Sequence, residues 1–137
     1  MKKTALVFLS ICFIAFSCKK EEAKSEHFLL LTGPVWEAVT LLVNGVDAGG
    51  SGGQLESLNG DAKFNEDGTG TFGTYTGTWY FFDLAETQIM ISPDTEPWSL
   101  LCTIEDLSAT TLIITAIMPN EQNPSEPLNI RIIFEAK

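Results

Sequence analysis

Along most of the chain, short runs of apolar and β-branched residues alternate with polar breaks, a pattern typical of β-strands. Aromatic side chains, which favour extended backbone, are concentrated in these runs, as in Trp79-Tyr80-Phe81-Phe82. From Phe28 onward, no stretch of ten or more residues has the apolar spacing of an amphipathic helix. The pattern predicts strands at 35–43, 61–65, 69–75, 78–83, 87–92, 98–105, 110–118 and 128–135.

The breaks between the runs carry residues that end strands. Asp67-Gly68 is typical of a tight hairpin, and the proline-rich stretch 119–127 cannot continue a hydrogen-bonded ladder. Eight strands with mostly short connections predict an all-β domain, either an eight-stranded antiparallel up-and-down barrel or a β-sandwich. Strict alternation would separate two faces of each strand, but Ile133 interrupts the polar face of 128–135, and 98–105 is apolar on both faces. The alternation of apolar and polar residues therefore does not distinguish a barrel from a sandwich.

One connection is unusually long. Asn44–Gly60 spans about seventeen residues and contains Gly49-Gly50-Ser51-Gly52-Gly53. Loops of this length within a domain are usually lids, binding loops or disordered segments, and the glycines predict flexibility. Residues 54–58 have the composition for one helical turn within it.

The first residues predict export. Lys2 and Lys3 precede a 13-residue apolar run, too short to span a bilayer of roughly 30 Å, and Ser17-Cys18 follows it. This order resembles the bacterial lipoprotein signal, which implies cleavage after residue 17 and acylation of Cys18 with palmitate. We therefore expect a signal peptide at 1–17, a polar tether at 18–27 and one domain at 28–137.

The expected location is the outer membrane, held by the lipid anchor. The tether begins Lys19-Lys20-Glu21-Glu22, which resembles a tag that sends lipoproteins of some Gram-negative bacteria to the cell surface. It is equally typical of an ordinary charged linker. The protein could therefore be located on the cell surface or on the periplasmic face of the outer membrane.

Charge narrows the range of partners. The formal net charge of −10 becomes −12 without Lys2 and Lys3, and the tether contributes nothing because its lysines and glutamates cancel. The only cations of the globular part are then Lys63, Arg131 and Lys137. Such a surface repels phosphate groups, which excludes nucleic acid as a partner. We expect membrane contact through the anchor only, and a monomer.

Candidate chemistry is sparse. The sole histidine, His27, lies in the tether, so the domain has no Ser-His or Cys-His pair, and Cys102 in its apolar context is expected to be a buried small hydrophobe. Asn65–Gly68 resembles part of a calcium loop. However, Lys63 occupies the first position of that loop, which needs an oxygen ligand, and Thr74 occupies the twelfth, which needs glutamate. The sequence predicts no metal, no cofactor and no enzymatic activity.

Spaced single residues resemble a known group of proteins. They are Gly33 before Trp36, then residues 43–47, the long connection, residues 63–72, 77–81 and 107–114. Their order resembles the lipocalin-like lipoproteins of the calycin group from Gram-negative bacteria. Gly33 and Trp36 are separated by two residues, whereas lipocalins proper have Gly-x-Trp, so the entry to the first strand is expected to be shifted or bulged.

The resemblance implies a barrel closed at one end, with Asn44–Gly60 as a flap over the open mouth. Trp36 would form the barrel floor, and Arg131, the sole arginine, would stack on it, although its strand face favours an exposed arginine instead. A small hydrophobic molecule would bind inside. The residues expected to line its site are Phe72, Trp79, Phe81 and Trp98.

Two functions follow from these expectations. The first is a lipid-anchored carrier of a small hydrophobic molecule. The second is a non-catalytic interaction or scaffolding module, or an inhibitor, whose own aromatic side chains fill the barrel, because eight strands enclose just enough space for either outcome. An enclosed apolar void beneath Asn44–Gly60 would favour the carrier.

Overall fold

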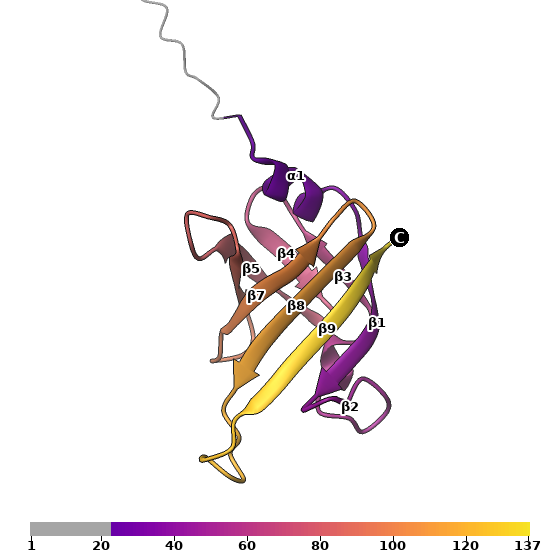
Figure 1. Cartoon of the computed structure of the whole chain (residues 1–137), viewed down its shortest axis with the longest axis vertical. Coiled ribbons are helices and arrows are strands. Elements are labelled where there is room, and N and C mark those ends of the chain that lie inside the picture. Colours follow the sequence, from indigo (N-terminus) through magenta and orange to yellow (C-terminus); the bar gives the residue numbers. More distant parts are fainter. Residues whose placement is uncertain (1–22) are drawn as a thin grey trace, which may run out of the picture.

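The computed structural model describes residues 23–137, so the predicted signal peptide and Cys18 lie outside the described part of the chain. One short helix precedes nine strands (Figure 1). The elements are α1 (Glu26–Thr32), β1 (Trp36–Val43), β2 (Val46–Asp47), the 3₁₀ turn η1 (Glu56–Leu58), β3 (Asp61–Phe64), β4 (Thr69–Phe72), β5 (Tyr75–Phe81), β6 (Gln88–Pro93), β7 (Leu100–Leu107), β8 (Thr111–Met118) and β9 (Leu128–Ala136).

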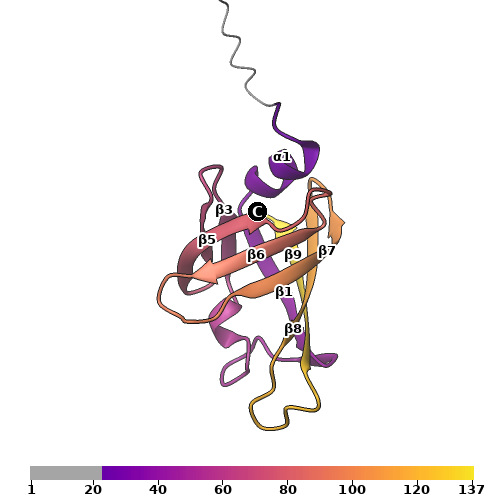
Figure 2. The ribbon, with the colours of Figure 1, turned by 90° about the vertical axis from the view of Figure 1, so that its left-hand side faces the viewer.

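The strands form a closed barrel. From β3 to β9, each strand pairs antiparallel with the next in sequence, and β1 pairs with both β3 and β9. Closure through the β1–β9 pairing confirms the predicted eight-stranded antiparallel barrel and excludes the open edges of a sandwich. The ninth strand, β2, is a two-residue addition to β1. Figure 2 shows β5, β6 and β7 wrapping around the side of the barrel.

Alternation along the strands builds the core. In β8 the side chains of Leu112, Ile114 and Ala116 are buried, and in β9 those of Ile130, Ile132 and Phe134. These strands pair along their whole length, so their inward rows meet inside the barrel. All eight predicted strands are present, and their ends differ from the predicted ends by a few residues.

Helix α1 covers one end of the barrel and was not predicted. Ser25 caps it by accepting a hydrogen bond from the Phe28 N–H, and Leu31 on its inner side is fully buried. At its other end Lys63 Nζ donates to the carbonyl oxygens of Thr32 and of Gly33, the latter at 3.1 Å. These bonds use helix carbonyls that have no partner within the helix. The helix begins before residue 28, so ordered structure extends into the predicted tether.

The long connection between β2 and β3 is packed rather than extended from the surface. Ala48 and Leu55 are buried in the core, and the Leu55 N–H donates to the Ala48 carbonyl at 2.9 Å. Asn59 Nδ2 donates to the Gly49 carbonyl at 2.7 Å. The single helical turn predicted at 54–58 is present as η1. The predicted flap is therefore tied to the barrel by side chains and backbone bonds.

One glycine of this connection can be tested directly. A Cβ at Gly53 would lie 2.2 Å from the carbonyl oxygen of Ala48, whereas a Cβ at Gly50 would meet no atom within 4 Å. We expect Gly53→Ala to lower the free energy of unfolding by about 1–3 kcal/mol, because backbone atoms must move. Gly50→Ala should leave it unchanged or slightly raised. Urea denaturation of both variants measures the difference, and equal midpoints would contradict the close approach.

Candidate functional site

Aromatic rings occupy the part of the barrel interior near α1. Phe64 packs edge-on against Phe72 and Trp79, with ring centroids 5.3 and 5.5 Å apart, and Trp79 packs edge-on against Phe81 at 5.4 Å. The Trp79 indole N–H donates to the Asn65 carbonyl at 2.9 Å, which satisfies its only polar atom. Edge-to-face contacts of this kind are favourable beyond the area they bury. Phe72, Trp79 and Phe81 therefore pack against other side chains of the barrel.

The remaining space inside the barrel is small. A cavity of about 20 Å³ lies inside the barrel beneath Leu58, a residue of the connection that was predicted as a flap. This volume is close to the smallest that holds one water molecule, whereas small-molecule sites typically have about 300–1,000 Å³. Of the four predicted lining residues, Phe72 and Trp98 line this cavity, and Trp79 and Phe81 do not. The complete lining is Leu58, Phe64, Phe72, Ile91, Pro93, Trp98, Leu100, Ile114, Ile132 and Phe134.

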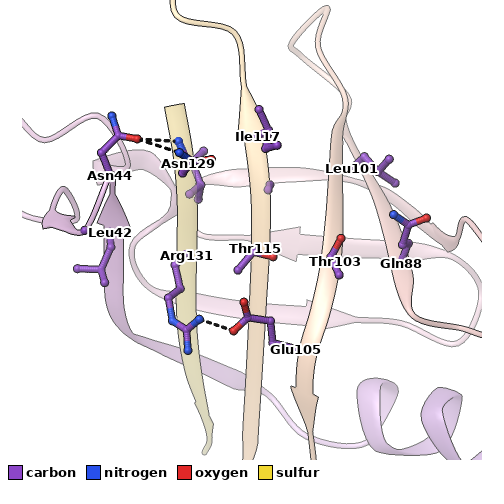
Figure 3. A pocket seen from close by; sticks show the side chains of 13 residues that line it. Leu42, Asn44, Gln88, Leu101, Thr103, Glu105, Thr115, Ile117, Asn129 and Arg131 are labelled. Carbon is purple, nitrogen blue, oxygen red and sulfur yellow. Dashed lines mark hydrogen bonds and ion pairs between the residues drawn. The ribbon is translucent and has the colours of Figure 1, made fainter. Parts of the chain in front are cut away.

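Trp36 and Arg131 do not meet. Trp36 is fully buried under α1, and its indole N–H donates to the Leu31 carbonyl at 3.0 Å. Arg131 projects from the outer face of β9, where its guanidinium pairs with Glu105 of β7 (Figure 3). The expectation of a barrel-floor Arg131 stacked on Trp36 is wrong. Side chains alternate between the two faces of β9. Ile130 and Ile132 point inward, so Arg131 between them points outward.

A wide hollow lies on the outside of the barrel. It is a groove of about 820 Å³ across β6 to β9 and the end of β1 (Figure 3). Its lining side chains come from five strands and the turn after β1. They are Leu42, Asn44, Gly45, Gln88, Leu101, Thr103, Glu105, Thr115, Ala116, Ile117, Asn129, Ile130 and Arg131. We call this surface the outer groove.

An apolar row of side chains runs across the strands and into the outer groove. Tyr80 of β5 lies opposite Met90 of β6, which lies opposite Leu101 of β7. Leu101 precedes the Cys102–Ala116 pair, which sets it opposite Ile117 of β8. Ile117 is 68% exposed and Leu101 37%. Four strands span about 14 Å at the usual strand spacing, so this apolar row is long enough to contact a partner element.

A polar row lies beside the apolar row, at a distance of two residues on each strand. Gln88 lies opposite Thr103, Thr103 opposite Thr115, and Thr115 opposite Arg131. Glu105 lies on the outward face of β7 with Leu101 and Thr103, and its carboxylate pairs with the Arg131 guanidinium. Both partners of this ion pair are about two-fifths exposed, so it orients the guanidinium and adds little stability.

Charge distinguishes the outer groove from the rest of the surface. Arg131 and Glu105 are its only charged lining residues and they neutralise each other. The globular part as a whole has an excess of twelve negative charges. Cores of protein interfaces are depleted of charged residues in the same way, while their rims are polar. Sequence reasoning missed the groove, although the apolar residues on both faces of 98–105 were a signal of it.

Residues 23–137 contain neither a reactive cysteine thiol nor a cluster of metal-ligating side chains. Cys102 is fully buried between strands, and burial raises the pKa of its thiol to about 12, which keeps it protonated and confirms the expected packing role. Among residues 23–137, no three His, Cys, Asp or Glu side chains group closely enough to hold a metal ion. The one α-helix described is too short to cross a membrane.

Comparison with known proteins assigns the chain to no family. The sequence matches no protein-family model, and no curated protein is significantly similar to it. What the structure defines is an all-β barrel with a filled interior and a neutral groove on its outer wall. Because one fold hosts many functions, the resemblance to lipocalin-like lipoproteins stays a prediction.

Proposed function

We propose that this protein is a lipid-anchored, non-catalytic interaction module of the cell envelope, whose protein partner docks on the outer groove. The observation that carries the proposal is the contrast between the inside and the outside of the barrel. The cavity inside the barrel has about 20 Å³, while the outer groove offers about 820 Å³ with an apolar row along it. The filled barrel therefore supports the interaction module over the carrier.

The chemistry of the outer groove suggests the kind of partner. The apolar row ending in Leu101 and Ile117 suits an apolar ridge, and the threonines and glutamine beside it offer hydrogen bonds to a polar edge of the partner. Acidic residues dominate the surrounding surface, so a neutral partner with a basic rim is favoured by charge complementarity. Such long-range attraction accelerates association more than it strengthens the final contact.

Anchoring is the part of the proposal supported by sequence. Lys2 and Lys3, the apolar run and Cys18 have the order of a lipoprotein signal, and the described domain begins a few residues after Cys18. Several acyl chains would make the attachment effectively permanent, whereas one would be marginal. An anchor of this kind would concentrate the outer groove at the outer membrane, where it would meet membrane-bound partners.

Photo-crosslinking in the producing cell tests the docking surface. We expect a photoreactive amino acid at Thr103, in the centre of the outer groove, to give a discrete heavier product that contains one partner protein. The same group at Gln122, in the exposed connection between β8 and β9, should not give that product. Identical product patterns from the two positions would contradict docking on the outer groove.

Uptake of an apolar dye tests the carrier directly. The folded wild-type protein is expected to bind no indole-sized probe, because the cavity beneath Leu58 is too small. Phe72→Ala, which removes a ring from the cavity wall, should admit such a probe, since apolar cavities of sufficient size bind small aromatic molecules. Isothermal titration of both proteins makes the comparison. Saturable one-to-one binding by the wild type would favour the carrier instead.

A further inference from the structure

The turn between β5 and β6 presents apolar side chains at the α1 end of the barrel. Leu84 is fully exposed and Phe82 is half-exposed, and Leu29 on α1 is half-exposed at the same end. A single exposed leucine is ordinary on a protein surface. Two large exposed apolar residues in one tight turn are less common, and Leu29 adds a third at the same end of the barrel. We call residues 82–86 the apolar turn.

Hydrogen bonds hold the apolar turn in one shape. The Asp83 carboxylate accepts from the backbone N–H groups of Thr87 at 2.8 Å and Gln88 at 3.0 Å, and from the Thr87 hydroxyl. The Phe82 N–H donates to the Gln88 carbonyl, and the Glu86 N–H donates to the Asp83 carbonyl. The charge of Asp83 is thus satisfied within the turn. Phe82 and Leu84 are exposed on a preorganised backbone, which reduces the entropy that a contact would cost.

The apolar turn is also fixed to the place where the chain enters the domain. Ser25 Oγ donates to Glu86 Oε2 at 2.5 Å, and His27 Nδ1 lies 3.2 Å from the Glu86 carbonyl oxygen. In both views α1 lies beside this turn (Figures 1 and 2). Cys18 is seven residues before Ser25, and a fully extended chain of that length reaches at most about 25 Å. An anchor at Cys18 would therefore keep this end of the barrel close to a bilayer.

We propose that the apolar turn inserts Phe82 and Leu84 into the surface layer of the bilayer that holds the anchor. This inference rests on the proposed lipid attachment, and it adds a second membrane contact to the expected contact through the anchor alone. A protein held by both has a defined orientation, with the α1 end toward the lipid. The outer groove, on the side wall of the barrel, then stays open to a partner in the same membrane.

The acidic residues near the apolar turn determine which lipid headgroups it can approach. Glu26, Glu66, Asp67 and Glu86 lie at the same end, and Lys24 is already paired with Glu66. Carboxylates beside the apolar turn would be repelled by anionic headgroups. The occupant is therefore a zwitterionic lipid surface, and replacing a third of its lipid with phosphatidylglycerol should weaken insertion severalfold at low salt.

Depth-dependent quenching tests the insertion. The full chain, acylated by its producing cell, carries a thiol-linked dye at Leu84→Cys and is reconstituted into phosphatidylcholine–phosphatidylethanolamine vesicles that contain nitroxide lipids. Gln122→Cys, in an exposed connection at the other end of the barrel, is the matched control, and buried Cys102 stays unlabelled in the folded protein. We expect quenching at position 84 to exceed that at position 122 severalfold, and Phe82→Ser to reduce it. Equal quenching at the two positions would overturn the proposal.

A second arm separates insertion from anchoring. Labelling with palmitate in the producing cell, compared between the wild type and Cys18→Ser, reports the anchor alone, and equal labelling would refute the acylated cysteine. The dye at position 84 of a Cys18→Ser chain produced without residues 1–17, which also lacks Cys12, mixed with excess vesicles, reports the apolar turn alone. Quenching that rises with lipid concentration there supports insertion even if the anchor fails. An anchored protein without quenching at position 84 overturns insertion and leaves the anchor intact.

Discussion

Replacing Trp36 with alanine is expected to lower the free energy of unfolding by about 3–5 kcal/mol, the usual cost of removing a large ring from a core. The indole is completely buried and its N–H is bonded to Leu31, so the change empties the space below α1 and breaks the link to it. Trp36 also lies opposite Ala62 of β3 and Ala136 of β9, at the seam where the barrel closes. The loss should therefore affect the whole domain.

Urea denaturation measures this effect through the midpoint and the slope of the transition. Trp36→Phe is the matched control, because it keeps an aromatic ring while removing the indole N–H, and it should cost clearly less. Trp98→Ala removes a ring of the same size from a half-buried position and should also cost less. If Trp36→Ala unfolds at the wild-type urea midpoint with the same slope, Trp36 does not stabilise the closed end of the barrel.

Replacing Ile117 with aspartate should weaken partner binding about thirtyfold or more, equivalent to about 2 kcal/mol, without a loss of folding stability. Ile117 lies at the end of the apolar row in the outer groove. A docked partner would bury the new carboxylate next to apolar atoms, and a buried charge without a partner is costly. Because the side chain is 68% exposed in the free protein, the domain itself should tolerate the change.

Val46→Asp is the matched control for this prediction. Val46 is 69% exposed, and it pairs with Val43, whose side chain points into the barrel rather than onto the outer groove. The yield of the photo-crosslink from Thr103 should fall in Ile117→Asp and remain in Val46→Asp. Loss of the product in both variants would indicate a general effect of added negative charge, and retention in both would remove Ile117 from the interface.

The strands were predictable because their signal is local. A period of two in 128–135 and the aromatic run 79–82 are visible in any short window, and both lie in strands except for Phe82, which begins the turn after β5. Helix α1 escaped prediction because seven residues are too few to establish a helical period, and tertiary contacts of Leu31 stabilise it. The glycines of 49–53 suggested flexibility, but at Gly53 they permit close packing against the backbone of Ala48.

The candidate site was less predictable than the fold. Aromatic residues such as Trp79 were recognised as inward-facing, but whether their rings leave a cavity depends on how rings from several strands fit together. The role of Arg131 at the barrel floor was wrong because the resemblance supplied it, while its own strand parity pointed outward. The outer groove depends on which residues of β6 to β9 lie opposite each other. This register is a property of strand pairs, so it cannot be predicted from the sequence of one strand alone.

By itself, the sequence determined the all-β class, the positions of the eight strands, the acidic surface and the predicted lipoprotein signal at Cys18. Each of these depends on composition or on residues within a short window. The tertiary structure alone decided that the barrel closes through β1 and β9, that its interior is filled, and that Ile117 and Arg131 share a groove. These features depend on contacts between residues far apart in the chain, which form only when closure sets the register and packing removes the empty space.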